Sequence, residues 1–163
     1  MQNQPNSIDS AGEFSPFQPE IKFVKTHEDA QLPFSKNDNP LTGDSGRDLY
    51  AVEPYIIEPG GSEVVNVGLQ LAYITPGYWF RIEARSGLGF KHGIQPHFGI
   101  VDNEYTGDLS VKLYNISRQP YHITKGDRIA QIVVYPLIQP IVSWADEVNE
   151  TSRGASGFGS SGK

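Results

Sequence analysis

The chain has 163 residues and no cysteine, so it can bury a core without cross-links, and disulfides, thiolate zinc sites and cysteine nucleophiles are excluded. Its 13 basic and 19 acidic side chains give a net charge of −6, which disfavours a partner as anionic as duplex DNA. No apolar run approaches the roughly 18 residues of a membrane span, and the first residues lack the basic and apolar regions of a secretory signal. We therefore expect a cytoplasmic protein that binds neither nucleic acid nor membrane.

The first twenty residues are polar, contain three prolines and show little hydrophobic periodicity. This composition is typical of a flexible extension, so we assign residues 1–20 to one. Phe14 and Phe17 could dock on another surface. A role for this extension in binding a protein partner stays open.

Strand-like segments begin at residue 21. Each is short, rich in β-branched and aromatic side chains, and bounded by Gly, Pro, Asn or Asp. They cover residues 21–25, 48–52, 62–73, 78–84, 108–116 and 128–138. A single helix of one or two turns is expected near 86–92. The spacing predicts an all-β sandwich, jelly roll or barrel over residues 21–146, followed by an arm over 147–163 that becomes glycine-rich.

Two segments place charged side chains at the ends of predicted strands. The run SGRDLYA at 45–51 puts Asp48 at a strand start, where it is either a solvated residue or a holder of a hydrated metal or an arginine. The run ARSGLG at 84–89 could direct Arg85, and the amides and hydroxyl of Ser86 and Gly87, at one anion, as Gly-bearing turns do. For each segment alone, an ordinary surface turn remains the alternative.

Two further segments combine an apolar strand with isolated polar side chains. In GIVDNEYTG at 99–107, Asp102 ends an apolar run, and partial desolvation there suits a residue that orients or deprotonates a water. Tyr105 offers a flat wall for a sugar or a base, although a hairpin corner with an aromatic plug fits equally well. In GDRIAQIVV at 126–134, Arg128 and Gln131 are the polar exceptions, and a buried amide without a partner costs about 1–3 kcal/mol.

The last segment, RGASGFGSSG at 153–162, is either a flexible tail or a flap that orders over an oligophosphate. In the second case Arg153 would clamp phosphate and Phe158 would stack on a base. The segment lacks the closing Gly-Lys-Ser/Thr of a nucleotide P-loop, so a kinase or ATPase is disfavoured. His92 and His97 are five residues apart, on opposite faces of any strand, so we expect no histidine metal site.

In this order and spacing, the five segments resemble the homotrimeric deoxyuridine triphosphatase (dUTPase) family from about Ile21 to the C-terminus. The resemblance implies a jelly-roll-like β-barrel subunit and a homotrimer with shared active sites, over which the C-terminal arm of a neighbouring copy closes. It also implies that dUTP is hydrolysed to dUMP and pyrophosphate by Mg²⁺-assisted attack of an Asp-oriented water on the α-phosphorus. This activity would keep uracil out of DNA and supply dUMP for thymidylate synthesis.

The resemblance also assigns roles to individual residues. The implied catalytic residues are Asp102 and Gln131. The implied phosphate-binding residues are Arg85, Ser86, Gly87, Gln131, Arg153, Gly159, Ser160 and Ser161. The implied nucleoside-binding residues are Gly99, Ile100, Val101, Asp102, Tyr105, Ser110 and Phe158, with uracil read by the backbone of a hairpin over 95–102. Asp48 would support the metal indirectly, through water.

The chain departs from the family pattern in two places. The hairpin carries Gln95-Pro96-His97-Phe98, which is bulkier than the small residues expected there. In the arm, Ser156 replaces a glycine that is common in the family, and Ser161 replaces a common threonine.

Two alternatives to a dUTPase are considered. A dCTP deaminase of the same superfamily would need a glutamate to shuttle protons at the base, and Glu104 in the turn is the nearby candidate. The sequence Tyr105-Thr106-Gly107 fits the triphosphatase better. A non-enzymatic β module with this fold would be expected to lack the aspartate, an arginine or the arm, all of which are present.

Overall fold

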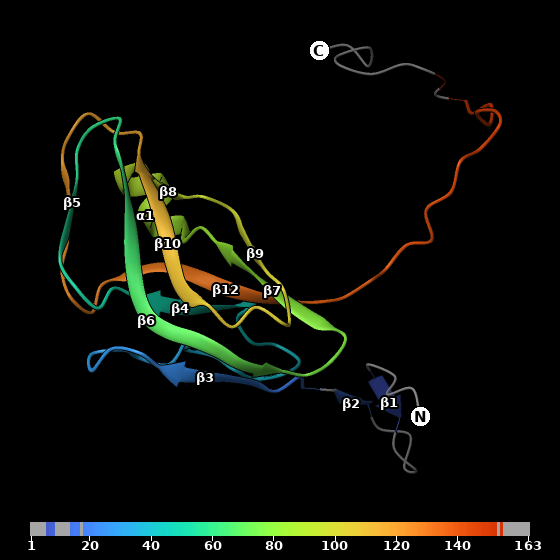
Figure 1. Ribbon diagram of the computed structural model, residues 1–163, viewed down its shortest axis with the longest axis horizontal. Coiled ribbons are helices and arrows are strands. Elements are labelled where there is room, and N and C mark those ends of the chain that lie inside the picture. Colours follow the sequence, from blue (N-terminus) through green and yellow to red (C-terminus); the bar gives the residue numbers. More distant parts are fainter. Residues whose placement is uncertain (1–5, 9–13, 17, 153, 155–163) are drawn as a thin grey trace.

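The computed structural model describes residues 6–8, 14–16, 18–152 and 154. The expected all-β fold is confirmed: two four-stranded antiparallel sheets have the orders β3-β6-β10-β8 and β4-β12-β7-β9 (Figure 1). The elements are β1 (Asn6–Ile8), β2 (Phe14–Pro16), β3 (Ile21–Lys25), β4 (Gly46–Tyr50), β5 (Tyr55–Ile57), β6 (Ser62–Ile74), β7 (Tyr78–Glu83), α1 (Ser86–His92), β8 (Ile94–Pro96), β9 (Gly99–Val101), β10 (Asp108–Asn115), β11 (Tyr121–Ile123) and β12 (Arg128–Pro136).

The two large sheets share one apolar core, and the alternation of buried and outward-facing side chains is clearest on β10. On β10, Leu109, Val111 and Leu113 are buried, while the residues between them are exposed. Across the core, the ring of Phe23 on β3 meets the edge of Phe80 on β7, with centroids 6.3 Å apart. The core therefore joins the two sheets into one unit.

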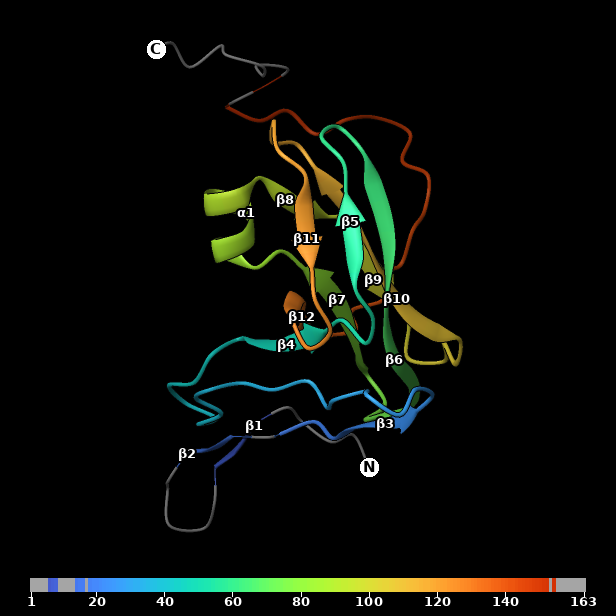
Figure 2. The ribbon, with the colours of Figure 1, turned by 90° about the vertical axis from the view of Figure 1, so that its left-hand side faces the viewer.

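A third ladder, β5 paired with β11, closes one end of the molecule, where α1 also lies (Figure 2). The fully buried Asn115, at the end of β10, ties this ladder to the main sheet. Its side-chain amide donates to the carbonyls of Ile57 and Gln119, both at 2.8 Å, and its Oδ1 accepts from the amide and hydroxyl of Ser117. All of its polar side-chain atoms are thus satisfied, as a buried amide requires.

The long strands and the helix lie where the sequence predicts them, with ends that differ by no more than two residues. The strand over 128–138 is shorter than predicted: β12 ends at Pro136, which has no amide hydrogen to continue the ladder. The three-residue strands β1, β2, β5 and β11 are not predicted from sequence. The strands β8 and β9 fall in the hairpin expected over 95–102, but they pair with β10 and β7 and not with each other. Among the described residues, no helix combines the length and apolarity needed to cross a membrane.

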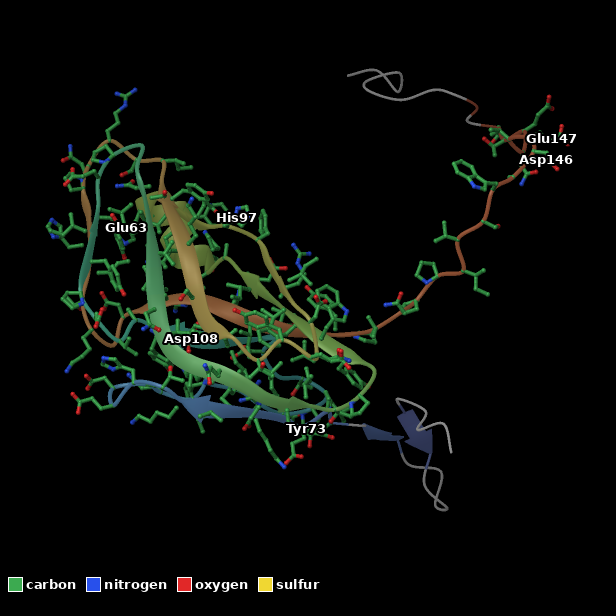
Figure 3. The ribbon with its side chains drawn as sticks, in the orientation of Figure 1. Glu63, Tyr73, His97, Asp108, Asp146 and Glu147 are labelled. Carbon is green, nitrogen blue, oxygen red and sulfur yellow. The ribbon has the colours of Figure 1, made fainter. Side chains whose placement is uncertain are left out.

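Beyond β12 the described chain contains no helix or strand and runs away from the sheets, carrying Asp146 and Glu147 far from the body (Figure 3). Ile141, Val142 and Trp144 on this stretch are almost fully exposed. Apart from Gly154, the fifth predicted segment lies outside the described residues.

Candidate active site

Asp48, on β4, is the centre of a charge cluster that joins three segments of the chain. Its Oδ1 accepts a hydrogen bond from Arg85 Nε at 2.6 Å, and its Oδ2 accepts one from Arg128 Nη1 at 3.1 Å. Arg85 Nη1 also donates to the carbonyl of Arg128 at 2.9 Å. The Asp48 and Arg85 side chains are only 18% and 23% exposed, so their ion pair is screened less than a surface pair. The cluster therefore fixes the Arg85 guanidinium just beyond the end of β7.

Gln131 lies next to this cluster, on the central strand β12. It stands opposite Asp48 on one side and Glu83 on the other, so the three side chains share one face of the sheet. Its Nε2 donates to the carbonyl of Ala84 at 2.8 Å, which satisfies the half-buried amide. The structure thus brings together Asp48, Arg85 and Gln131.

Arg128 belongs to the same cluster but was not among the predicted site residues. The available signal was its place as a polar exception in the fourth segment, which does not say what the side chain contacts.

The turn after β7 presents backbone groups beside Arg85. Arg85 has an extended backbone and directly precedes α1. Its carbonyl accepts hydrogen bonds from the amides of Leu88 and Gly89, at 3.1 and 3.2 Å. Ser86 and Gly87 lie between Arg85 and these two donors in the chain, and both are exposed. Arg85 and Ser86 line one hollow together with Gln131. The predicted phosphate-binding turn therefore opens onto the predicted catalytic glutamine.

The predicted nucleoside-binding residues gather at a second place. A separate hollow is lined by Gly99, Ile100 and Val101 of β9 together with Tyr105 and Ser110. The Tyr105 hydroxyl donates to the carbonyl of Asp108 at 3.1 Å, which holds the ring. The bulky His97 and Phe98 do not line this hollow, and the Phe98 ring instead lies 5.6 Å from the Arg81 guanidinium carbon.

Asp102 is exposed at the end of β9, where it and Tyr105 line a further hollow beside Trp79. The Tyr105 amide donates to the Asp102 carbonyl at 3.0 Å and closes the turn.

Within one chain, the Asp102 turn and the Asp48 cluster are far apart. Gln131 is opposite Glu83 on β7, whereas Asp102, one residue beyond Val101, falls opposite Trp79. Four residues along the strand and two strand spacings across the sheet separate the Gln131 and Asp102 backbones by roughly 16 Å. The remaining predicted residues, Arg153, Phe158, Gly159, Ser160 and Ser161, lie outside the described part of the chain.

The family model described as dUTPase matches residues 36–162. The chain belongs to the dUTPase family.

Similar relatives are known as deoxyuridine 5′-triphosphate nucleotidohydrolases. That of Idiomarina loihiensis is 42% identical over 125 residues, covering 74% of this chain and 83% of the relative. That of Wolinella succinogenes is 41% identical over 147 residues, covering 88% and 94%. The human mitochondrial protein is 33% identical over 144 residues, covering 88% and 55%.

Solved dUTPase structures share the fold. A Staphylococcus bacteriophage 80alpha dUTPase with dUpNHpp matches with a TM-score of 0.78 at 24% identity, over 88% of this chain and 99% of that one. A mutant dUTPase of phage phi11 of S. aureus, described as coordinating a structural Mg(II) ion, has a TM-score of 0.71 at 21% identity, over 80% and 99%.

In this dUTPase-family chain, the described residues do not fit a metal ion held by protein ligands. Both carboxylate oxygens of Asp48 already accept hydrogen bonds from guanidinium groups. No three His, Cys, Asp or Glu side chains in the described ranges are grouped so that they could hold a metal ion.

Tyr121, on β11, is a titratable group near the same cluster. Burial raises its pKa above the usual 10.0, and the negative charge of Asp127 raises it further, while Arg85 lowers it. The phenol therefore keeps its proton to a higher pH than a free tyrosine does.

Proposed function

We propose that this chain hydrolyses dUTP to dUMP and pyrophosphate. The observation that carries the proposal is the convergence of Asp48, Arg85 and Gln131 from β4, the turn after β7 and β12, beside an open hollow. Membership of the dUTPase family supports the same reaction. In the cell, this reaction would keep uracil out of DNA and supply dUMP for thymidylate synthesis.

In the proposed reaction the substrate is the magnesium complex of dUTP, and Asp48 would support the metal indirectly, through water. Asp102 orients a water and accepts its proton as the oxygen attacks the α-phosphorus. Gln131 lies beside that phosphate, and Arg85 with the amides of Ser86 and Gly87 stabilises negative charge as pyrophosphate leaves. Asp48 holds Arg85 in place.

The active site is proposed to form between copies of the chain in a homotrimer. A water held by Asp102 must lie within about 3–3.5 Å of the phosphorus it attacks. The hollows beside Gln131 and Asp102 share no lining residue, and the two backbones are roughly 16 Å apart, which favours a site built from two copies. A second copy that supplies Asp102, Tyr105 and the β9 hollow would complete the site.

Specificity is proposed to come from the nucleoside side. The Tyr105 ring forms a wall that packs beneath deoxyribose and leaves no room for a 2′-hydroxyl. The backbone of 95–102 and of Ser110 reads uracil, and a close fit there excludes the methyl group of thymine.

The C-terminal arm, residues 147–163, is proposed to close over a neighbouring site. Its residues would include Arg153 and the hydroxyls of Ser160 and Ser161 on the terminal phosphates, Gly159 beside them, and Phe158 over uracil. Closure would exclude water from the reacting centre. Residues 21–146 form the dUTPase domain, and residues 1–20 are an extension open to a protein partner. We place the protein in the cytoplasm.

Pyrophosphate release with Mg²⁺ from dUTP, UTP, dTTP and dCTP tests the proposal. Rapid release from dUTP alone is expected. Binding of dUTP without release would indicate a non-enzymatic module, and ammonia from dCTP would indicate a deaminase.

A further inference from the structure

Gly46, on β4, leaves the space that the Gln131 side chain occupies. A β-carbon built at position 46 would overlap Gln131 Oε1 and lie 2.6 Å from its Cδ, closer than real β-carbon contacts. The backbone of Gly46 is not in the left-handed region, so an alanine would be accepted there but for this side chain. On its other side, the Gln131 amide is held by the Ala84 carbonyl. The absent β-carbon and this hydrogen bond together define one position for Gln131.

Gly107 likewise leaves the space that the Tyr105 ring occupies, in the nucleoside part of the candidate site. A β-carbon at position 107 would overlap the Tyr105 hydroxyl and lie 2.6 Å from Cζ. This backbone, too, is outside the left-handed region. The hydroxyl meanwhile donates to the Asp108 carbonyl, so the ring is fixed between that bond and the space above Gly107.

We infer that Gly46 and Gly107 are positioning residues: the first sets Gln131 for turnover, and the second sets Tyr105 for sugar selection. This inference rests on the proposed function, because it assumes that Gln131 lies beside the α-phosphate and that Tyr105 packs beneath the deoxyribose. A methyl group at either position would move one side chain of the site while leaving the chain's charges unchanged.

Gly46→Ala should lower kcat for dUTP by about 100-fold, as displacement of an aligned group by an ångström does, with little change in KM. Gln131→Ala provides the decisive background: adding Gly46→Ala to it should change kcat by less than about twofold, because the displaced group is gone. A full additional loss in that background would overturn the assignment of Gly46.

Gly107→Ala should raise kcat/KM for UTP relative to dUTP by about tenfold, because the shifted ring no longer excludes the 2′-hydroxyl. In a Tyr105→Ala background the same substitution should leave that ratio unchanged. An unchanged ratio in the Gly107→Ala single variant would overturn the assignment of Gly107.

Gly61→Ala is the matched control, because its β-carbon would meet the Glu58 carbonyl at 3.0 Å, in a turn outside the candidate site. It should keep the wild-type kcat and substrate ratio. If Gly46→Ala does not fold, as judged by thermal unfolding, the Gly46→Ala/Gln131→Ala variant must fold, and its failure would refute the inference. Absence of dUTP turnover in the unmodified chain would overturn the proposed function itself, and this inference with it.

Discussion

The cluster around Asp48 and the turn at Asp102 are held by different forces. In the cluster, a partly buried carboxylate binds two guanidinium groups, and a backbone carbonyl orients Gln131. At the turn, Asp102 and Tyr105 are exposed; the Tyr105 amide donates to the Asp102 carbonyl, and the Tyr105 hydroxyl donates to the Asp108 carbonyl. Contacts within one copy therefore fix the proposed phosphate-binding half, whereas the exposed Asp102 turn, the proposed water-holding half, is left open to a second surface.

Asp102→Asn tests the turn with the largest expected effect. The amide cannot accept a proton from water, so kcat for dUTP should fall by about 10³-fold while binding of a non-hydrolysable analogue is retained. Steady-state pyrophosphate release and calorimetric titration measure the two quantities. Glu104→Gln, two residues away in the same turn, should stay near the wild-type rate. A near-normal rate for Asp102→Asn would remove Asp102 from the mechanism.

Deletion of residues 153–163 tests the arm, and with it the sharing of sites between copies. The deletion should lower kcat/KM on the order of 100-fold through loss of closure. The thermal midpoint should be retained, because the buried core and the side chains packed against it run from Ile21 to Val134. Mixing the truncated chain with full-length Asp102→Asn, after joint unfolding and refolding, should restore part of the activity. Inactive mixtures would argue for sites complete within one chain.

Asp48→Asn tests the cluster. Loss of the carboxylate charge leaves Arg85 and Arg128 without their shared anion, so we expect about a tenfold loss in kcat/KM and about 1–2 kcal/mol lower unfolding free energy. Asp29→Asn, which breaks the more exposed pair with Lys125 at 3.2 Å, should cost less than about 0.5 kcal/mol. If urea unfolding shows the same loss of unfolding free energy for Asp48→Asn and Asp29→Asn, the cluster is not preorganised by charge.

Tyr121→Phe tests the raised pKa of Tyr121 and has the smallest expected effect. The pKa of Tyr121 is raised in the folded state, so the unfolded chain releases the phenol proton at a lower pH than the folded chain does. The contribution of the Tyr121 proton to stability is therefore complete below pH 10 and declines as the pH rises above that value. The difference in unfolding free energy between wild type and Tyr121→Phe should therefore shift in favour of the variant at alkaline pH. Urea unfolding of both proteins at pH 8 and above pH 10 measures it, and a constant difference would contradict the raised pKa.

Much of the fold could be predicted because the long strands and α1 carry their signals locally. Alternation over 65–71 and the Gly/Pro/Asn/Asp boundaries are properties of neighbouring residues. The strands β8 and β9 have three residues each, too few for a period to show, and they exist because β10 and β7 pair with them.

The candidate site shows the same limit. The resemblance carried by the five segments points to Asp48, Arg85 and Gln131, but the contact of Arg128 with Asp48 spans 80 residues of sequence. Likewise, the space that Gly46 provides for Gln131 arises only when β4 pairs with β12.

The place of β12 has a consequence for biosynthesis. This strand lies between β4 and β7 and is hydrogen-bonded to both, yet it comes after both of them in the chain. During translation, β4 and β7 are made before the strand that joins them, so their facing edges stay open until β12 has been made. Folding of the second sheet is thus expected to wait for β12. The arm follows β12 in the chain, so it would emerge onto a sheet that has only just formed.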